Sequence, residues 1–267
     1  MNQVSLALPD RKYYIEGFKN SAYQAYFKLM VDCAKKMGAT DENANSDMKE
    51  VLELETQLAQ ITVPEEEMRD ADSQYNLINK KSLVQKYENL QLNNLIDYLS
   101  GNTFSDAEEL NVAVPPYLDR LNDLIPKTKK RTLANYIIWR VVLESLPHLS
   151  QDWRDLYFQF TQTLDGSKSD VPRSQFCLLR VSANFDIALS SLYILKNVRL
   201  NNKIQQEASI IVNEVIKTAK QELRKIEWMQ DSTKQQAIEK LNQLISITAY
   251  PKEYLNTKKV DKQYAEV

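Results

Sequence analysis

Residues 132–146 read TLANYIIWRVVLESL. Ten of these fifteen residues are apolar, and at 3.6 residues per turn their side chains cover most of the circumference of a helix. A helix that is apolar nearly all round is typical of the interior of a sizeable protein. The stretch therefore predicts a buried central helix, with Thr132 as its N-cap and Pro147 beyond its end.

Two charged residues interrupt this helix, and Trp139 is its largest apolar side chain. Arg140 and Glu144 stand four residues apart, a spacing at which opposite charges on a helix can pair. A bilayer-spanning helix needs about 20 predominantly apolar residues, so this shorter, charged stretch predicts no membrane segment. We interpret Trp139, Arg140 and Glu144 as structural residues of the central helix.

The composition indicates a folded, mainly helical chain of 267 residues. Hydrophobic residues make up 43% and charged residues 26%, while only 4 glycines and 8 prolines are present. The scarcity of turn formers disfavours all-β folds and disorder. With 34 basic against 36 acidic residues, the chain shows no basic excess, and we expect no nucleic-acid partner.

Helical spacing of apolar residues recurs along the whole chain. We expect a mostly α fold, a multi-helix orthogonal or antiparallel bundle around the buried central helix, with at most one minor short strand or hairpin. Asp47 is predicted to begin the second helix, and capping boxes at 62–65 and 105–108 predict two further helix starts. Residues 110–114 alternate apolar and polar side chains and predict an isolated strand.

The last third of the chain is the most regular. Residues 208–226 follow an a/d spacing for nearly three heptads. A final helix is expected after Trp228, which lies at the bend, and Pro251 follows that helix. We expect the two helices to lie side by side as an antiparallel pair.

Catalytic chemistry has few candidate residues here. A catalytic zinc site usually needs three protein ligands, and the H-E-x-x-H motif needs two histidines, whereas His148 is the only one present. The chain has no P-loop or dinucleotide-binding motif. Cys33 lies on an apolar helix stripe, and a small core residue is favoured there over a reactive thiol. We therefore assign no catalytic residue and no metal ligand.

Several short motifs occur in a fixed order along the chain. They are Leu8-Pro-Asp-Arg-Lys-Tyr-Tyr14, Leu52-Glu-Leu-Glu-Thr-Gln-Leu-Ala59, Arg69-Asp with Tyr75-Asn76, Pro116-Tyr-Leu118, Leu133-Ala-Asn-Tyr-Ile-Ile-Trp-Arg140, Arg173 with Cys177, Leu192-Tyr193, Trp228-Met with Asp231, Thr233-Lys234, Ala237 and Lys240, and Tyr250-Pro251. In this order and spacing, the chain resembles the N-terminal region of the neprilysin and endothelin-converting-enzyme family of zinc metallopeptidases. The resemblance runs nearly end to end.

The resemblance implies a protein with two mostly helical lobes that have different roles. Members of the family are membrane-anchored or secreted ectoenzymes that cleave small peptides, which implies a plasma-membrane ectodomain or a secreted protein. Their C-terminal lobe carries H-E-x-x-H and a downstream Glu as third zinc ligand, and both are absent here. We expect residues 1–267 to be a single helical region corresponding to the non-catalytic cap lobe, which forms cleft walls and a size filter. Its partner is then the catalytic lobe of the same polypeptide, and zinc belongs to that lobe.

Three positions depart from the family pattern. Cys177 stands where the family has a cysteine whose disulfide partner lies upstream of Met1, so the resemblance implies a free thiol. Ser174 stands where a Trp is usual, and Ala249 replaces the usual Gly before Tyr250.

Two functional hypotheses follow. The first is a cap-lobe portion of a neprilysin-like zinc metalloendopeptidase that is inactive alone and exposes apolar surface to the missing lobe. The alternative is a stand-alone, non-catalytic helical interaction protein derived from that family, with the stripe at 208–226 as its docking face. An in-frame H-E-x-x-H helix downstream in the gene favours the first, and a native start with a firm stop codon favours the second.

Overall fold

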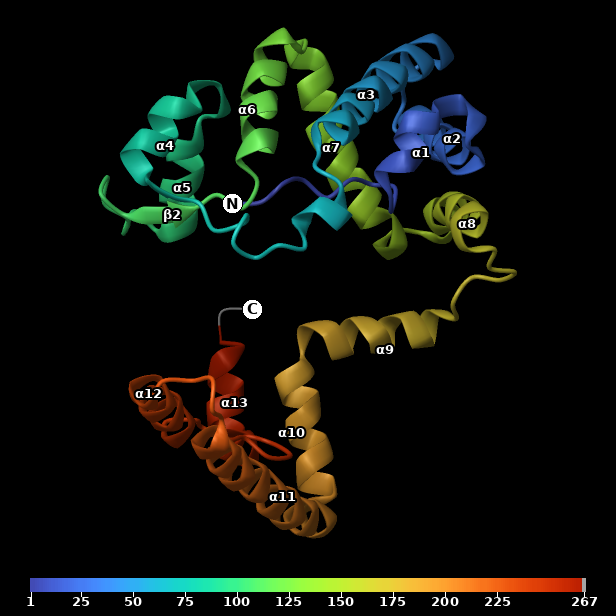
Figure 1. The fold of residues 1–267 in the computed structure, drawn as a ribbon. Helices are drawn as coiled ribbons and strands as arrows, with labels where there is room; N and C mark the ends of the chain where they lie inside the picture. The colour runs from blue at the N-terminus through green and yellow to red at the C-terminus, as the bar shows by residue number, and fades with distance from the viewer. Residues whose placement is uncertain (266–267) are drawn as a thin grey trace. The chain divides into compact units, whose positions relative to one another are not determined.

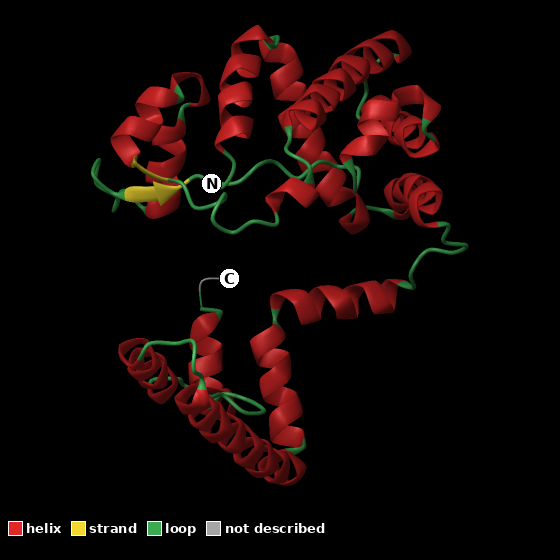
Figure 2. Cartoon of the chain, viewed as in Figure 1, coloured by secondary structure: helices red, strands yellow, loops and turns green. Residues whose placement is uncertain are grey.

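A computed structural model describes residues 1–265, without the side chains of residues 198–201. Helices dominate the described part, which holds thirteen α-helices and one pair of short strands (Figures 1 and 2). The mostly helical fold expected from the sequence is confirmed. The chain forms two compact units, Met1–Asp170 and Val171–Val267, whereas no boundary was predicted within residues 1–267.

The first unit contains eight of these helices and both strands (Figure 1). Asn20 caps the helix that follows it by accepting hydrogen bonds from the backbone of Ala22 and Tyr23. Its elements are α1 (Arg11–Glu16), α2 (Ser21–Lys36), α3 (Asp41–Ile61), β1 (Leu77–Asn79), α4 (Lys80–Lys86), α5 (Leu92–Ser100), β2 (Glu109–Asn111), α6 (Pro115–Leu124), α7 (Lys130–Ser145) and α8 (Gln151–Asp165).

Two clusters of buried apolar side chains hold the first unit together. In the larger one, α2 packs against α3 and α8, while α3 also packs against α1 and α7. The buried side chains there include Tyr26, Met30, Leu52, Trp139 and Leu146. Cys33 belongs to this cluster, as its place on the apolar stripe predicts.

The smaller cluster lies among α4, α5 and α6 and the segment after β2. Beside it, β1 and β2 pair antiparallel with Ile78 opposite Leu110. The strand predicted within 110–114 is therefore real but shorter and not isolated, because β1 supplies its partner. Leu110 packs against the cluster, so the two-stranded sheet covers one side of it.

The second unit consists of five helices: α9 (Arg173–Asn184), α10 (Asp186–Lys196), α11 (Val198–Lys225), α12 (Asp231–Asn242) and α13 (Thr257–Gln263). α11 packs against α12, and the side-chain amide of Gln205 donates to the carbonyl of Thr248 (3.3 Å). The chain beyond α12 thus returns to the early part of α11, which agrees with the predicted antiparallel pair. α10 packs against α13 and the turn before it.

The central helix differs from the sequence prediction in one important respect. α7 buries Thr132, Trp139 and Leu143, but Ile137 is 62% and Val141 is 60% exposed. It is therefore a helix with one face in the core and one apolar face uncovered in the described chain. The expectation of burial all round is wrong, because apolar composition alone does not say which faces have a neighbour.

Several helix boundaries also differ from those predicted. Thr132 is not an N-cap, because α7 already begins at Lys130. α3 begins at Asp41 and not at Asp47, since Thr40 accepts a hydrogen bond from the backbone of Asn43. Residues 105–108 form a turn, and no helix follows it directly. The helix start predicted from the capping box at 105–108 is therefore wrong.

Candidate functional site

The side chains that could bind zinc are dispersed in the described residues. Within residues 1–265, no three side chains of His, Cys, Asp or Glu come together in a group that could hold a metal ion. His148 lies in a short 3-10 turn directly after α7. A catalytic zinc centre has three protein ligands, and the described residues bring no such set together.

The most unusual polar site is a buried carboxylate, Glu55 of α3, which is 0% exposed. Its Oε2 accepts a hydrogen bond from the hydroxyl of Tyr26 (2.7 Å), and its Oε1 accepts one from the backbone N–H of Ala7 (2.9 Å). Burying an ionised carboxylate is costly unless it is hydrogen-bonded and paired with a charge. Glu55 thus ties α2 and the N-terminal segment to α3.

The Glu55 network continues into α7. The indole Nε1–H of Trp139 donates to the hydroxyl of Tyr26 (2.6 Å), which itself donates to Glu55. The rings of Tyr26 and Trp139 lie 5.9 Å apart between centroids. Trp139 is therefore part of a hydrogen-bonded chain that joins three helices.

Burial governs the protonation of this network. Desolvation raises the pKa of Glu55, and the hydrogen bond from Tyr26 is the largest opposing effect. The pKa of Tyr26 is raised well above its ordinary value by burial and by the nearby Glu55 carboxylate. Both effects keep the Tyr26 hydroxyl protonated, so it remains the donor to Glu55.

Arg140 takes part in the same network, contrary to the predicted pairing with Glu144. Its Nη1 donates to the carbonyl of Ser5 (2.9 Å) and to the hydroxyl of Tyr136 (3.2 Å), and lies 3.5 Å from Oε1 of Glu55. Glu144 is exposed. The side chain of Arg140 turns toward the buried carboxylate because that charge has lost its water.

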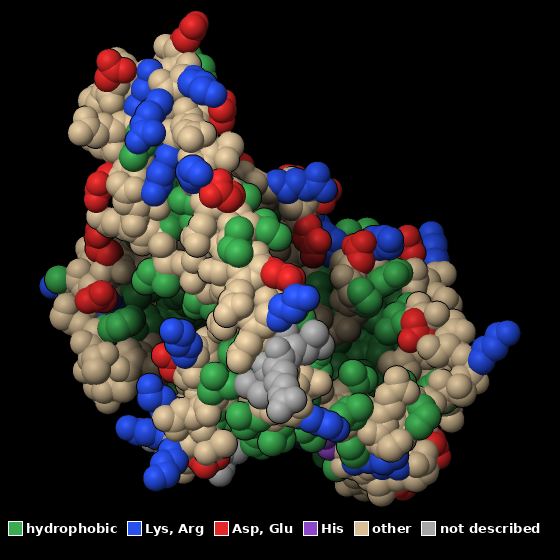
Figure 3. All heavy atoms as spheres, turned by 90° about the horizontal axis from the view of Figure 1, so that it is seen from below, with side chains coloured by type: hydrophobic (Ala, Val, Ile, Leu, Met, Phe, Trp, Pro, Cys, Tyr) green, Lys and Arg blue, Asp and Glu red, His purple; other side chains and the backbone are tan. Residues whose placement is uncertain are grey.

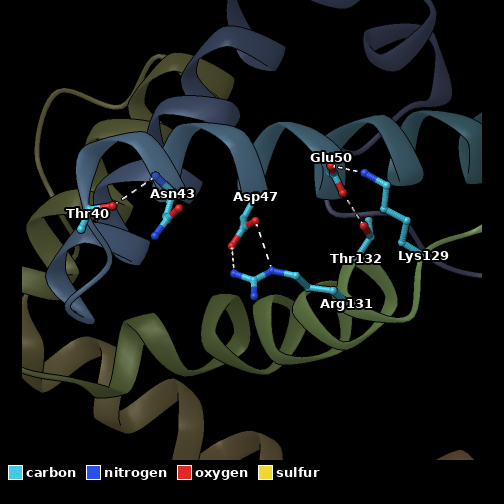
Figure 4. Close-up of polar contacts among 7 residues, drawn as sticks. All are labelled: Thr40, Asn43, Asp47, Glu50, Lys129, Arg131 and Thr132. Carbon is cyan, nitrogen blue, oxygen red and sulfur yellow. Dashed lines mark hydrogen bonds and ion pairs between the residues drawn. The ribbon is translucent and has the colours of Figure 1, made fainter.

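A second set of polar contacts joins α3 to the start of α7, as Figure 4 shows. Arg131 donates to both carboxylate oxygens of Asp47 (2.6 and 3.4 Å). Glu50 accepts from Lys129 (2.6 Å) and from the hydroxyl of Thr132 (2.7 Å). Thr132 thus fixes α7 against α3.

The Glu55 network was missed by sequence analysis although a signal was present. Glu55 stands three to four residues from Val51, Leu52, Leu58 and Ala59, all on the buried face of α3. A carboxylate in the middle of an apolar stripe predicts a buried, satisfied charge.

The remaining structural candidates, Cys177 and Trp228, lie in the second unit. Cys177 is an exposed free thiol on α9, and Trp228 is 81% exposed in the turn between α11 and α12. Ala249, where a Gly was expected, has φ +62°, in the left-handed region that favours glycine. Ser174 is exposed on α9.

Apolar side chains are unusually exposed in the second unit. Neither buried apolar cluster includes a residue from it, and its buried side chains among those described are Ser191, Ile194, Tyr250 and Val260. Figure 3 shows hydrophobic side chains spread over the face it draws. The large apolar residues exposed on its helices include Leu178, Leu179, Leu192, Tyr193, Ile210, Ile211 and Val215.

Membrane-spanning potential is limited in the described residues. None of their helices is by itself long and apolar enough to cross a bilayer, and only the pair α9 and α10, bent by 97°, passes jointly on length and composition.

Comparisons with known proteins agree with the sequence resemblance. The family model described as peptidase family M13, for its N-terminal region, matches residues 1–251. Neprilysin-2 of Drosophila melanogaster is 31% identical over 100% of this chain, and endothelin-converting enzyme 1 of Cavia porcellus is 29% identical over 99%. The chain spans only 36% and 35% of the lengths of these two relatives.

Solved structures show the same fold. Zinc metalloprotease ZMP1 of Mycobacterium tuberculosis in its open state matches with a TM-score of 0.74 at 21% identity, covering 91% of this chain and 38% of that one. Its inhibitor complex matches with a TM-score of 0.67, covering 90% of this chain and 36% of that one. At this identity the likeness concerns the fold alone.

Proposed function

The chain belongs to peptidase family M13, as the N-terminal region of neprilysin-like and endothelin-converting-enzyme-like peptidases, and on that premise we propose that it works as a non-catalytic cap lobe. In this role it forms walls of a substrate cleft and limits the size of the peptides that enter. Hydrolysis would belong to a catalytic lobe of the same polypeptide, whose zinc would supply Lewis-acid activation of water. The chain alone is inactive.

The observation that carries this proposal is the uncovered apolar surface of the second unit. A soluble monomer rarely exposes contiguous apolar patches larger than a few hundred Å². Here α9, α10 and α11 expose large aliphatic and aromatic side chains, and the second unit contributes nothing to the buried apolar clusters. Since the relatives are almost three times as long, the missing part of such a polypeptide is the natural cover for these faces.

The metal-binding side chains of this chain also support the division between a non-catalytic cap lobe and a catalytic lobe. With one histidine in the sequence, and no group of three metal-binding side chains in residues 1–265, this chain offers no place for the family's zinc. The Glu55 network supplies rigidity instead, by joining α2, α3, α7 and the N-terminal segment. A stiff lobe is what a size filter requires.

The first test uses the purified chain. Its zinc content after dialysis is measured by atomic emission, and cleavage of a small fluorogenic peptide is followed with and without a chelator. We expect no tightly held zinc and no chelator-sensitive cleavage. One equivalent of retained zinc, or hydrolysis that the chelator abolishes, contradicts the proposal.

A second test asks whether the chain can cap an active catalytic lobe. In Neprilysin-2 of Drosophila melanogaster, the region aligned with this chain is replaced by residues 1–267. We expect the chimaera to cleave small peptides while sparing a large unfolded protein. A catalytic lobe without any cap serves as control and should lose this discrimination. A chimaera that is active on large and small substrates alike contradicts the size-filter role.

A stand-alone interaction protein is the second candidate, favoured by one observation. On α11, Ile211 and Val215 are exposed, while Val212 and Leu223 of the same stripe are half-buried. An exposed apolar row on a long helix is a common docking face. The flanking genomic sequence separates the two candidates, since the cap-lobe role requires a downstream H-E-x-x-H helix in frame.

A further inference from the structure

A surface pocket lies among α2, α3 and α7, separate from the Glu55 carboxylate. Its volume is about 220 Å³, and most of its lining is apolar. Four sulfur-containing side chains line it: Met30, Cys33, Met37 and Met48. The chain has only six methionines and two cysteines, so half of its sulfur side chains gather at this pocket.

The sequence explains this gathering. Met30 and Cys33 of α2 and the C-cap residue Met37 are spaced by three and four residues, so they fall on the same side of that helix. Met48 comes from α3 and Trp139 from α7. Met37 and Ile138 are more than half exposed and lie at the mouth, while Met30 and Cys33 are buried and form the floor.

The chemistry of the lining favours an aromatic guest. Methionine is flexible and polarisable, adapts to the shape of what it contacts, and makes favourable sulfur–aromatic contacts. An apolar cavity of about 150 Å³ already accommodates benzene. A pocket of about 220 Å³ therefore has room for one six-membered ring with a small substituent.

The pocket also has a polar edge. Asn135 of α7 is half-buried, lines the pocket, and has no hydrogen bond to another residue of the described chain through its side-chain amide. Asp47 lines it too, but its carboxylate is engaged by Arg131, as Figure 4 shows. Burial raises the pKa of the Cys33 thiol to about 12, so the floor is uncharged at neutral pH. These features favour a neutral ligand with one hydrogen-bonding group.

We propose that this pocket, lined by Met30, Cys33, Met37 and Met48, binds a neutral single-ring aromatic molecule that carries one hydrogen-bonding substituent. The ring lies among the sulfur atoms, and its substituent meets the amide of Asn135. This site lies in the first unit, whereas the cap-lobe proposal rests on the exposed faces of the second unit.

The methionines themselves provide the test, with an internal control. The 267-residue chain is labelled with ¹³C at the methionine methyl groups and titrated with phenol in an NMR experiment. We expect saturable shifts for Met30, Met37 and Met48, caused by the ring current of the bound ligand, and no saturable shift for Met1, Met68 and Met229. Equal drift of all six signals, or no saturation for the three pocket signals, contradicts the proposal.

Two matched variants locate the ligand. Ala34 lines the pocket and Ala134 is exposed on α7 outside it, so Ala34→Leu should weaken phenol binding about tenfold or more, whereas Ala134→Leu should leave it unchanged. Asn135→Ala should weaken phenol binding but leave benzene binding unchanged. If Ala34→Leu fails to fold, the methionine methyl shifts of the wild type during the phenol titration still test the proposal. Phenol affinity that is unchanged in a folded Ala34→Leu contradicts the assignment.

Discussion

At the scale of single residues, the structure depends on a buried charge that the sequence signals only indirectly. The apolar stripe of α3 could be predicted from its spacing, and so could the burial of Cys33 and Trp139. The partners of Glu55 could not be predicted, because Ala7, Tyr26 and Arg140 come from distant segments and their meeting depends on tertiary packing. The rule that opposite charges four residues apart on a helix can pair instead suggested that Arg140 pairs with Glu144. That rule does not take into account that a carboxylate buried away from water requires a charged partner.

Tyr26→Phe tests the hydrogen-bonded chain. The change removes one hydroxyl, so the buried Trp139 Nε1–H loses its acceptor and the buried Glu55 carboxylate loses one of its donors. Because each unsatisfied group costs about 1–3 kcal/mol, we expect the free energy of unfolding to fall by about 2–4 kcal/mol. Urea unfolding measures it. The matched control is Tyr98→Phe, since Tyr98 is 83% exposed. Equal effects of the two changes contradict the role of Tyr26.

Glu55→Gln tests the protonation of the network. The pKa of Glu55 is raised in the folded state, mainly by burial, so folding favours the protonated carboxyl. The stability that this group contributes is therefore fully present below its unfolded pKa of 4.5 and is lost as the pH rises through the folded value. The glutamine variant lacks this titration.

The measurement is the free energy of unfolding by urea at several pH values between about 4 and 8. We expect the stability of the wild type relative to Glu55→Gln to decline as the pH rises. Glu88→Gln makes the same chemical change at an exposed position and serves as the control. A wild type that gains stability over Glu55→Gln with rising pH contradicts the assignment.

At the scale of elements, apolar spacing predicted where the helices lie in the sequence, but it did not predict which of their faces are buried. The helix at 132–146 exists as α7, but its apolar residues split between the core and an uncovered face. Composition cannot make that distinction, because Ile137 and Leu143 look equally apolar in sequence. Strand β1 was missed for a related reason: three residues carry too little pattern, and their pairing with β2 is set by tertiary contacts.

The two faces of α7 give a direct test of this correction. We expect the double change Ile137→Gln and Val141→Gln to alter the free energy of unfolding by no more than about 0.5 kcal/mol, because both side chains are largely exposed. It should also reduce concentration-dependent association in analytical ultracentrifugation, since it removes apolar surface. Leu143→Gln on the buried face of the same helix should cost several times more. A severe loss of stability in the double variant contradicts exposure of this face.

At the scale of the whole molecule, the two units differ in what holds them together. The first unit has two buried apolar clusters and the Glu55 network, whereas neither cluster includes a described residue after Asp170. The boundary was not predictable, because the polar loop before residue 172 resembles other loops of the chain. The lower burial of apolar side chains in the second unit could not be predicted either. Residues 208–226 have the apolar spacing of a packed helix, although several of their apolar side chains are exposed.

This contrast predicts unequal resistance to proteolysis. Regions with few buried apolar contacts open at low free energy, so a protease at low concentration should cut first near residues 166–172 and then throughout the second unit. Mass spectrometry should therefore find a persistent fragment close to residues 1–170. The separately expressed segment 1–170 should melt cooperatively by circular dichroism, and the segment 171–267 should not. If both segments resist digestion and melt cooperatively, the second unit is self-sufficient, its exposed faces need no cover, and the cap-lobe proposal loses its main support.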